Sequence, residues 1–162
     1  MKLQPTIQNI PKKTLIGMPV TMSLTENKTS QLFRTFMPRK QEISHTINAD
    51  IFDLRTYPED YFLQFQPTAT FTKWALAEVS EIENIPEGME VFTLQGGLYA
   101  MFLYKGLSTD PTIFQYIFAE WLPKSDYLLD NRPHFEVLGE KAKLNDPNSE
   151  EEIWVPIRLK DK

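Results

Sequence analysis

In order along its second half, the chain reads Gly97-Leu98-Tyr99-Ala100-Met101-Phe102, Glu120-Trp121-Leu122-Pro123, His134-Phe135-Glu136-Val137-Leu138 and Glu152-Ile153-Trp154-Val155-Pro156-Ile157. Strand-forming segments flank an aromatic helical one, and this order decides the fold. Glu136 is an acidic residue in a predicted strand whose neighbouring residues are apolar. Burying an unpaired carboxylate costs several kcal/mol, so a buried Glu136 needs a partner, a raised pKa or a ligand. The pattern therefore predicts a pocket beside Glu136.

The bulk properties indicate one compact domain over residues 1–162. The chain has no cysteine and a formal charge of −5, and it contains no large basic cluster. These features favour the cytoplasm and argue against direct binding of nucleic acid. No window approaches the roughly 20 apolar residues of a membrane span, so no membrane association is expected.

Two helices are predicted from spacing. Asp110 as N-cap and Pro111 at the first helical position open one, which carries apolar residues at helical intervals and ends at Pro123. The other starts near residues 25–28 and continues past Pro38 with a kink.

Seven strands are predicted between Pro, Gly and Asn-rich turns: Leu15–Ser23, Ile51–Tyr57, Thr70–Glu78, Glu90–Leu94, Leu98–Tyr104, Phe135–Glu140 and Ile153–Leu159. Two helices with about seven strands indicate an α+β fold. Residues 143–152 are polar and acidic, so we expect them to form an exposed connection.

The two halves also resemble each other, which indicates pseudo-repeats over about residues 10–95 and 96–160. Residues 74–78 align with 136–140, and residues 89–92 align with 152–155. In this alignment Trp74 is the counterpart of Glu136. Each repeat would be a strand-helix-strand-strand unit, and the two would join edge to edge into one sheet.

The ordered segments resemble the GyrI-like small-molecule-binding family, whose fold also forms the effector-binding domain of AraC-type and MerR-type regulators. The match includes Tyr99-Ala100-Met101-Phe102, Glu120-Trp121-Leu122-Pro123, Phe135-Glu136 and Ile153-Trp154-Val155-Pro156-Ile157, and residues 33–57 resemble the integron-associated effector-binding branch. The resemblance implies two SHS2-like repeats, one antiparallel sheet with both helices on one face, and a cleft between the repeats with Glu136 as its acid. Asp126 stands where the family usually has glycine, which affects the placing of Tyr127.

On this interpretation Glu136 holds a hydrophobic, cationic small molecule, and aromatic rings add cation–π attraction. Trp74 would face Glu136 across the cleft, and Tyr99 or Tyr127 would donate a hydrogen bond. Each of these side chains could equally serve core packing. The remaining predicted lining residues lie on the two helices and are Phe114, Phe118, Trp121, Phe33 and Met37.

Three functions remain open. The first is a stand-alone effector-binding protein, with neither cofactor nor metal, that regulates transcription only through a partner. The second, implied by the family, is a small hydrolase of cyclopropane-type compounds that uses Glu136 with Tyr99 or Tyr127 for proton transfer. The third is a protein-interaction module like the gyrase-inhibiting relatives. The sequence contains no nucleophile elbow, phosphate loop or metal-ligand spacing that would indicate another chemistry.

Overall fold

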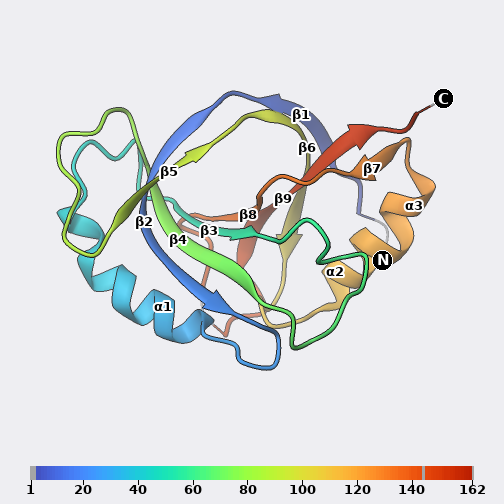
Figure 1. Cartoon of the computed structure of the whole chain (residues 1–162), viewed down its shortest axis with the longest axis horizontal. Helices are drawn as coiled ribbons and strands as arrows, with labels where there is room; N and C mark the ends of the chain where they lie inside the picture. Colours follow the sequence, from blue (N-terminus) through green and yellow to red (C-terminus); the bar gives the residue numbers. More distant parts are fainter. Residues whose placement is uncertain (1–2, 144, 162) are drawn as a thin grey trace.

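The computed structural model describes residues 3–143 and 145–161, and it shows a strongly curved antiparallel sheet with helices on its outer side (Figure 1). The predicted α+β class is confirmed. The strands are β1 (Thr6–Ile10), β2 (Lys13–Met22), β3 (Ile51–Thr56), β4 (Phe71–Val79), β5 (Glu90–Leu94), β6 (Gly97–Lys105), β7 (Tyr127–Leu129), β8 (His134–Leu138) and β9 (Glu150–Leu159). The helical segments are α1 (Thr29–Phe36) with a 3₁₀ turn (Met37–Glu42), and α2 (Thr112–Tyr116) with a π-helical turn (Ile117–Trp121) and α3 (Leu122–Lys124).

The strand order is symmetric about the middle of the sheet. It runs β1-β6-β9-β8-β3-β4-β2-β5, with β7 paired to β9. From the central β3–β8 pair outward, each half contains three strands in the same order. The first comes after a helical segment (β3 or β8), the second is the next strand in the chain (β4 or β9), and the third precedes the helix (β2 or β6). The chain passes directly from β1 to β2 and from β5 to β6, and Figure 1 shows these two connections closing the upper side of the curve.

This symmetry corrects the alignment of the two halves. Apart from the three-residue β7, β3 and β8 are the first strands after the helices, so β3 corresponds to β8 and β4 corresponds to β9. The sequence alignment had matched β4 with β8 and β5 with β9, one strand out of step. The counterpart of Glu136 is consequently Asp53, which lies directly opposite it in the β3–β8 register.

Alternation along the strands gives the sheet two distinct faces. The inner face of the curve holds an apolar and aromatic core from strands of both halves, namely Ile10, Leu15, Phe52, Leu54, Leu76, Leu94, Tyr99 and Phe135. The outer face carries two separate cores. One packs under α1 and includes Ile16, Met18, Leu32, Phe36, Ala75 and Ala77. The other packs under α2 and includes Ala100, Phe102, Ile113, Ile117, Ile153 and Val155.

Local capping explains where the helices begin. The side chain of Asn27 accepts a hydrogen bond from the Thr29 backbone N–H at 2.9 Å, and Asp110 accepts one from Thr112 at 3.0 Å. The helices start at these threonines, slightly later than predicted. None of the helices in the described part of the chain has the length and apolar character needed to cross a membrane.

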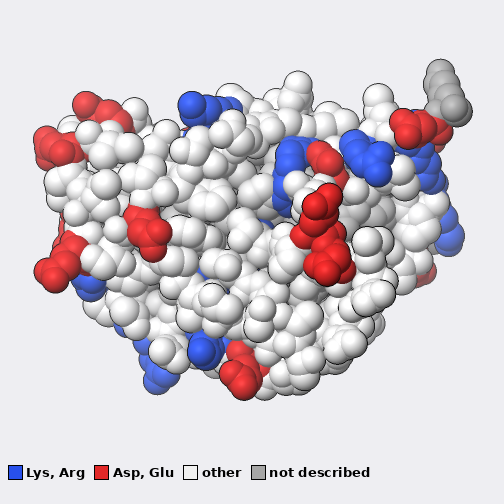
Figure 2. Space-filling model, viewed as in Figure 1, with Lys and Arg blue, Asp and Glu red and all other residues white. Residues whose placement is uncertain are grey.

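Three further differences from the sequence analysis concern strands. β1 and β7 were not predicted, and β9 begins at Glu150 inside the stretch expected to be an exposed loop. As a result Glu151 is buried. On the face of the molecule seen in Figure 2, acidic and basic side chains are scattered and intermixed, with broad neutral areas between them.

Candidate functional site

Five ionisable side chains lie side by side on the outer face of the sheet, between the cores of the two helices. We call them the charged seam: Asp53 and Arg55 of β3, Lys73 of β4, Glu136 of β8 and Glu151 of β9. The four other than Arg55 are each less than 9 % exposed, and the Arg55 side chain is 14 % exposed. Their common face follows from the register, which places Asp53 opposite Glu136 and Arg55 opposite Lys73.

Two ion pairs cross the seam. Arg55 Nη1 lies 3.5 Å from Glu136 Oε1, and Lys73 Nζ lies 3.4 Å from Asp53 Oδ2. Lys73 also donates to Thr29 Oγ1 at the start of α1, at 3.0 Å. Two like charges directly opposite each other on a sheet repel, so the bases are needed to hold Asp53 and Glu136 together.

The pairing is incomplete. Asp53 Oδ1 and Arg55 Nε are buried, and neither has a hydrogen-bond partner among the described residues. Nearly all buried polar groups in proteins form hydrogen bonds with protein or water. An unsatisfied buried acceptor and an unsatisfied buried donor in the same seam are therefore available to bind a polar group of another molecule.

Glu151 is the acid of the seam for which the described residues form no ion pair. The ion pairs within the described residues assign Arg55 to Glu136 and Lys73 to Asp53. Burial, together with the carboxylates of Glu136 and Asp53, raises the pKa of Glu151 to about 8. Burial also raises the pKa of Glu136, against the opposing effect of Arg55. At neutral pH Glu151 is therefore largely protonated.

Aromatic rings cover the Arg55 end of the seam. The Arg55 guanidinium lies 5.7 Å from the ring centre of Phe114 on α2. The His134 ring meets Tyr57 at 5.0 Å, Phe62 at 5.7 Å and Phe118 at 6.1 Å. Burial, aided by the positive charge of Arg55, lowers the pKa of His134 to about 3, so its imidazole is neutral. Phe62 is 46 % exposed and forms the outer layer of this aromatic group.

The structure brings three of the predicted site residues, Glu136, Phe114 and Phe118, to this one region. It separates Trp74 and Tyr99 from them. Trp74 pairs with Leu54, and Tyr99 packs on Phe135, which places both side chains on the inner face. The expectation that Trp74 faces Glu136 across a cleft is wrong. Trp74 shares a face with its partner Leu54, and Leu54 points away from the face of its neighbour Asp53, which is the face that carries Glu136.

The other predicted residues also serve packing away from the seam. Tyr99 donates its hydroxyl to the Pro133 carbonyl at 2.8 Å. Tyr127 stacks on Trp121 and pairs with Leu159, six residues along β9 from the partner of Glu136, which corresponds to about 20 Å of strand.

Trp121 contacts Phe102 edge-on in the α2 core, Phe33 borders the α1 core, and Met37 is exposed. The residue set predicted for a hydrolase, Glu136 with Tyr99 or Tyr127, is therefore not assembled.

Sequence reasoning missed Asp53, Arg55, Lys73 and Glu151. A signal for the first two was present, because Asp53 and Arg55 alternate with Phe52 and Leu54 in the predicted strand. With the halves aligned as the structure has them, Asp53 would have been matched with Glu136. Glu151 lies between two other glutamates, and nothing local distinguishes the buried one.

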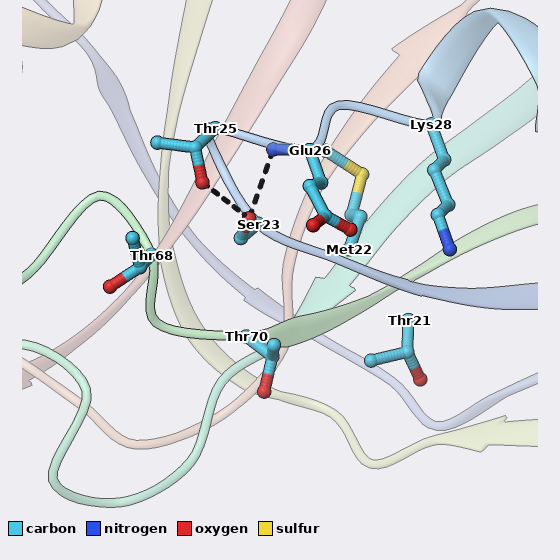
Figure 3. A pocket seen from close by; sticks show the side chains of 8 residues that line it. All are labelled: Thr21, Met22, Ser23, Thr25, Glu26, Lys28, Thr68 and Thr70. Atoms are coloured by element: carbon cyan, nitrogen blue, oxygen red, sulfur yellow. Dashed lines mark hydrogen bonds between the residues drawn. The ribbon is translucent and has the colours of Figure 1, made fainter.

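Two hollows of the surface lie outside the seam. One of about 290 Å³ is lined by Thr21, Met22, Ser23, Thr25, Glu26, Lys28, Thr68 and Thr70 (Figure 3). Ser23 there accepts hydrogen bonds within its own turn, including one of 3.0 Å from the Glu26 backbone N–H. The other, of about 200 Å³, lies beside Tyr61. Neither is lined by a residue of the seam.

A known protein of similar sequence is a transcriptional regulator. The transcriptional regulator BrlR of Pseudomonas aeruginosa is 29 % identical over 151 residues, which cover 91 % of this chain and 53 % of BrlR. The chain thus spans about half the length of that relative.

Solved structures share the fold at low sequence identity. The structure of SAV2435 bound to tetraphenylphosphonium matches with a TM-score of 0.68 at 14 % identity, over 96 % of this chain and 94 % of that one. The integron cassette protein VCH_CASS2 of Vibrio cholerae matches with a TM-score of 0.62 at 15 % identity, over 96 % of each chain. The family described as integron-associated effector binding protein matches residues 6–157. The predicted GyrI-like resemblance is confirmed, and the chain belongs to this family of effector-binding proteins.

Proposed function

We propose that the protein binds a hydrophobic organic cation at the charged seam, between the two helical segments. The observation that carries this proposal is the imbalance of the seam, in which the described residues place three buried carboxyl groups against two bases. A buried acid in excess favours a cation, because its carboxylate form then gains a counter-charge that water does not screen.

The aromatic group beside the seam suits the hydrophobic part of such a ligand. Phe114 already makes a cation–π contact with Arg55, and Phe118 lies against Phe62 and His134. A ligand cation over these rings would gain about 0.5–2 kcal/mol per contact. Phe62 is half exposed, so this aromatic group meets solvent at its outer edge.

The comparisons support the same class of ligand. SAV2435, which shares the fold, has been solved with tetraphenylphosphonium, a hydrophobic cation. BrlR is a transcriptional regulator, and this chain matches about half of it. We therefore propose that the bound cation is an effector, and that any effect on transcription depends on what the binding domain is attached to or associates with.

A pair of ions with the same shape and opposite charge tests the proposal directly. Calorimetric titrations with tetraphenylphosphonium and tetraphenylborate separate charge from hydrophobic contact. We expect the phosphonium to bind at least about tenfold more tightly, since the seam carries an excess of acid. Equal binding of the two ions, or tighter binding of the borate, would contradict a cation site.

A matched pair of variants locates the site. Glu136→Gln removes a buried charge and leaves Arg55 uncompensated, so we expect tetraphenylphosphonium affinity to fall about tenfold or more. Glu140→Gln changes an exposed glutamate just beyond the same strand and should leave the affinity unchanged. Circular dichroism of both variants confirms that the fold is retained.

A further inference from the structure

We propose that Glu151 is the group that balances the charge of the ligand, and that it releases its proton when a cation binds at the seam. This inference rests on the proposed function and deepens it. It assigns the recognition of charge to a residue other than Glu136, and it couples binding to one proton.

The position of Glu151 places it within reach of the ligand region. β9 pairs Ile153 with Glu136, so Glu151 is the diagonal neighbour of Glu136 on the same face of the sheet. Diagonal neighbours on adjacent strands have Cα atoms about 7–8 Å apart, a separation that long side chains bridge. Glu151 is only 7 % exposed, although Glu150 and Glu152 on either side of it are more open to solvent.

The surroundings of Glu151 on each neighbouring strand explain why its charge is uncompensated. Tyr104 of β6 lies directly opposite it, and Glu136 lies on β8. Asp53 and Arg55 of β3 and Lys73 of β4 act on it from farther away. Both bases of the seam are engaged by the other two acids, so within the described part of the chain no ion pair gives Glu151 a counter-charge.

The chemistry of an empty seam and of an occupied seam therefore differs by one proton. Without a ligand, a protonated Glu151 leaves two carboxylates against two bases, which is electrically balanced, and its raised pKa of about 8 agrees with this state. When a cation enters, its charge favours the carboxylate form of Glu151. The O–H bond of the acid breaks, the proton goes to solvent, and the cation takes its place as counter-charge.

Proton linkage predicts how affinity depends on pH. Below the pKa of Glu151, each bound cation must displace about one proton, so the affinity should rise about tenfold for each pH unit. This increase should flatten as the pH passes the pKa. Glu136 already faces a counter-charge in Arg55 at 3.5 Å, so the released proton is assigned to Glu151.

The experiment is calorimetry with tetraphenylphosphonium near neutral pH in buffers of different ionisation enthalpy, which reports the number of protons released. For the unmodified protein we expect about one proton per bound cation. Glu151→Gln should release almost none, bind at least about tenfold more weakly above pH 8, and lose the dependence on pH. Glu150→Gln, an exposed neighbour on the same strand, should behave like the unmodified protein.

The outcomes separate this inference from the proposed function. Binding of tetraphenylphosphonium without proton release, or with the same release in Glu151→Gln, overturns the role of Glu151 and leaves the cation site standing. Absence of binding refutes the proposed function and this inference together. If Glu151→Gln does not fold, the pH dependence of the unmodified protein decides, because a flat affinity between pH 6 and 8 contradicts the linkage.

Discussion

The inner and outer faces of the same strands differ in how they treat polar groups. Phe135 and Glu136 are adjacent in β8, yet Phe135 stacks on Phe52 and Trp154 inside the curve, and Glu136 faces Arg55 outside it. The inner face is a continuous core drawn from both halves of the sheet. The outer face has two cores separated by charge. At the boundary between the two halves, the side chains are thus apolar on the inner face of the sheet and ionisable on the outer face.

Two arginines make the contrast concrete. Arg132, next to the inner core, pairs with Asp130 at 2.6 Å and donates to the Leu98 and Ile157 carbonyls at 2.6 and 2.9 Å. Its guanidinium lies 4.7 Å from the ring centre of Tyr99. Gly97 allows this approach, because a Cβ there would lie 2.5 Å from Arg132 Nη1.

Arg55, on the outer face, has a looser ion pair and a buried Nε with no partner among the described residues. Arg132 makes more and shorter contacts, although its own Nη1 also has no hydrogen-bond partner among the described residues. We infer that Arg132 fixes β6, β9 and the turn before β8, and that Arg55 belongs to a site whose contacts can rearrange.

The largest expected effect comes from the inner face. Phe135→Ala removes a fully buried ring that contacts three others, and we expect it to lower the free energy of unfolding by about 3–5 kcal/mol. Urea unfolding measures the loss. Glu151→Gln near pH 5, which changes the outer face without removing a partner of an ion pair in the seam, serves as the comparison. A similar loss of stability in both variants would remove the distinction between the faces.

Arg132→Ala should have the next largest effect. It removes a charge-assisted ion pair and two hydrogen bonds to backbone carbonyls, so we expect a loss of about 2–3 kcal/mol in unfolding free energy. Tetraphenylphosphonium affinity, measured well below the melting temperature, should not change. If Arg132→Ala instead lost tetraphenylphosphonium binding and kept its full stability, the functional site would lie on the inner face, against the proposal.

The outer face should make stability depend on pH through Glu151. Its raised pKa means that the folded state holds a proton which the unfolded chain loses, so the stabilisation is present below the unfolded pKa and is lost as pH rises toward 8. Glu151→Gln should match the unmodified protein near pH 5 and exceed it near pH 8 by on the order of 2 kcal/mol. Melting curves at both pH values measure the difference, and a constant offset would contradict it.

Phe118→Ala should produce the smallest effect. The ring is half buried and lies against Phe62 and His134, so its removal should weaken tetraphenylphosphonium binding by about fivefold, equivalent to roughly 1 kcal/mol. Trp121→Ala, which acts in the α2 core, should lower stability more than affinity. If Trp121→Ala weakens tetraphenylphosphonium binding and Phe118→Ala lowers only stability, the aromatic group beside the seam does not contact the ligand.

Most of the fold could be predicted because apolar alternation and Gly, Pro and Asn turns mark the long strands. β1 was missed because it is a largely exposed edge strand with polar residues, and β7 has only three residues. The pairing of strands was harder to predict. A duplicated pattern can be aligned one strand out of step without any local conflict, and only the sheet order shows that β3 is the counterpart of β8.

The site could be predicted only in part for the same physical reason. Glu136 stands out because its neighbours in the strand are apolar. Trp74 and Tyr99 looked equally suitable, yet a strand pattern shows which residues share a face without showing which face meets the helices. Glu151 becomes exceptional only when β9 is laid against β6 and β8, since burial by distant strands raises its pKa.

The most direct test of the central claim is a crystal structure of the protein with tetraphenylphosphonium. We expect the cation on the outer face between α1 and α2, with its rings against Phe118 and its charge beside Glu136 and Glu151. A cation found instead in the threonine-lined hollow of Figure 3, or among the aromatic rings of the inner face, would contradict the charged seam as the binding site.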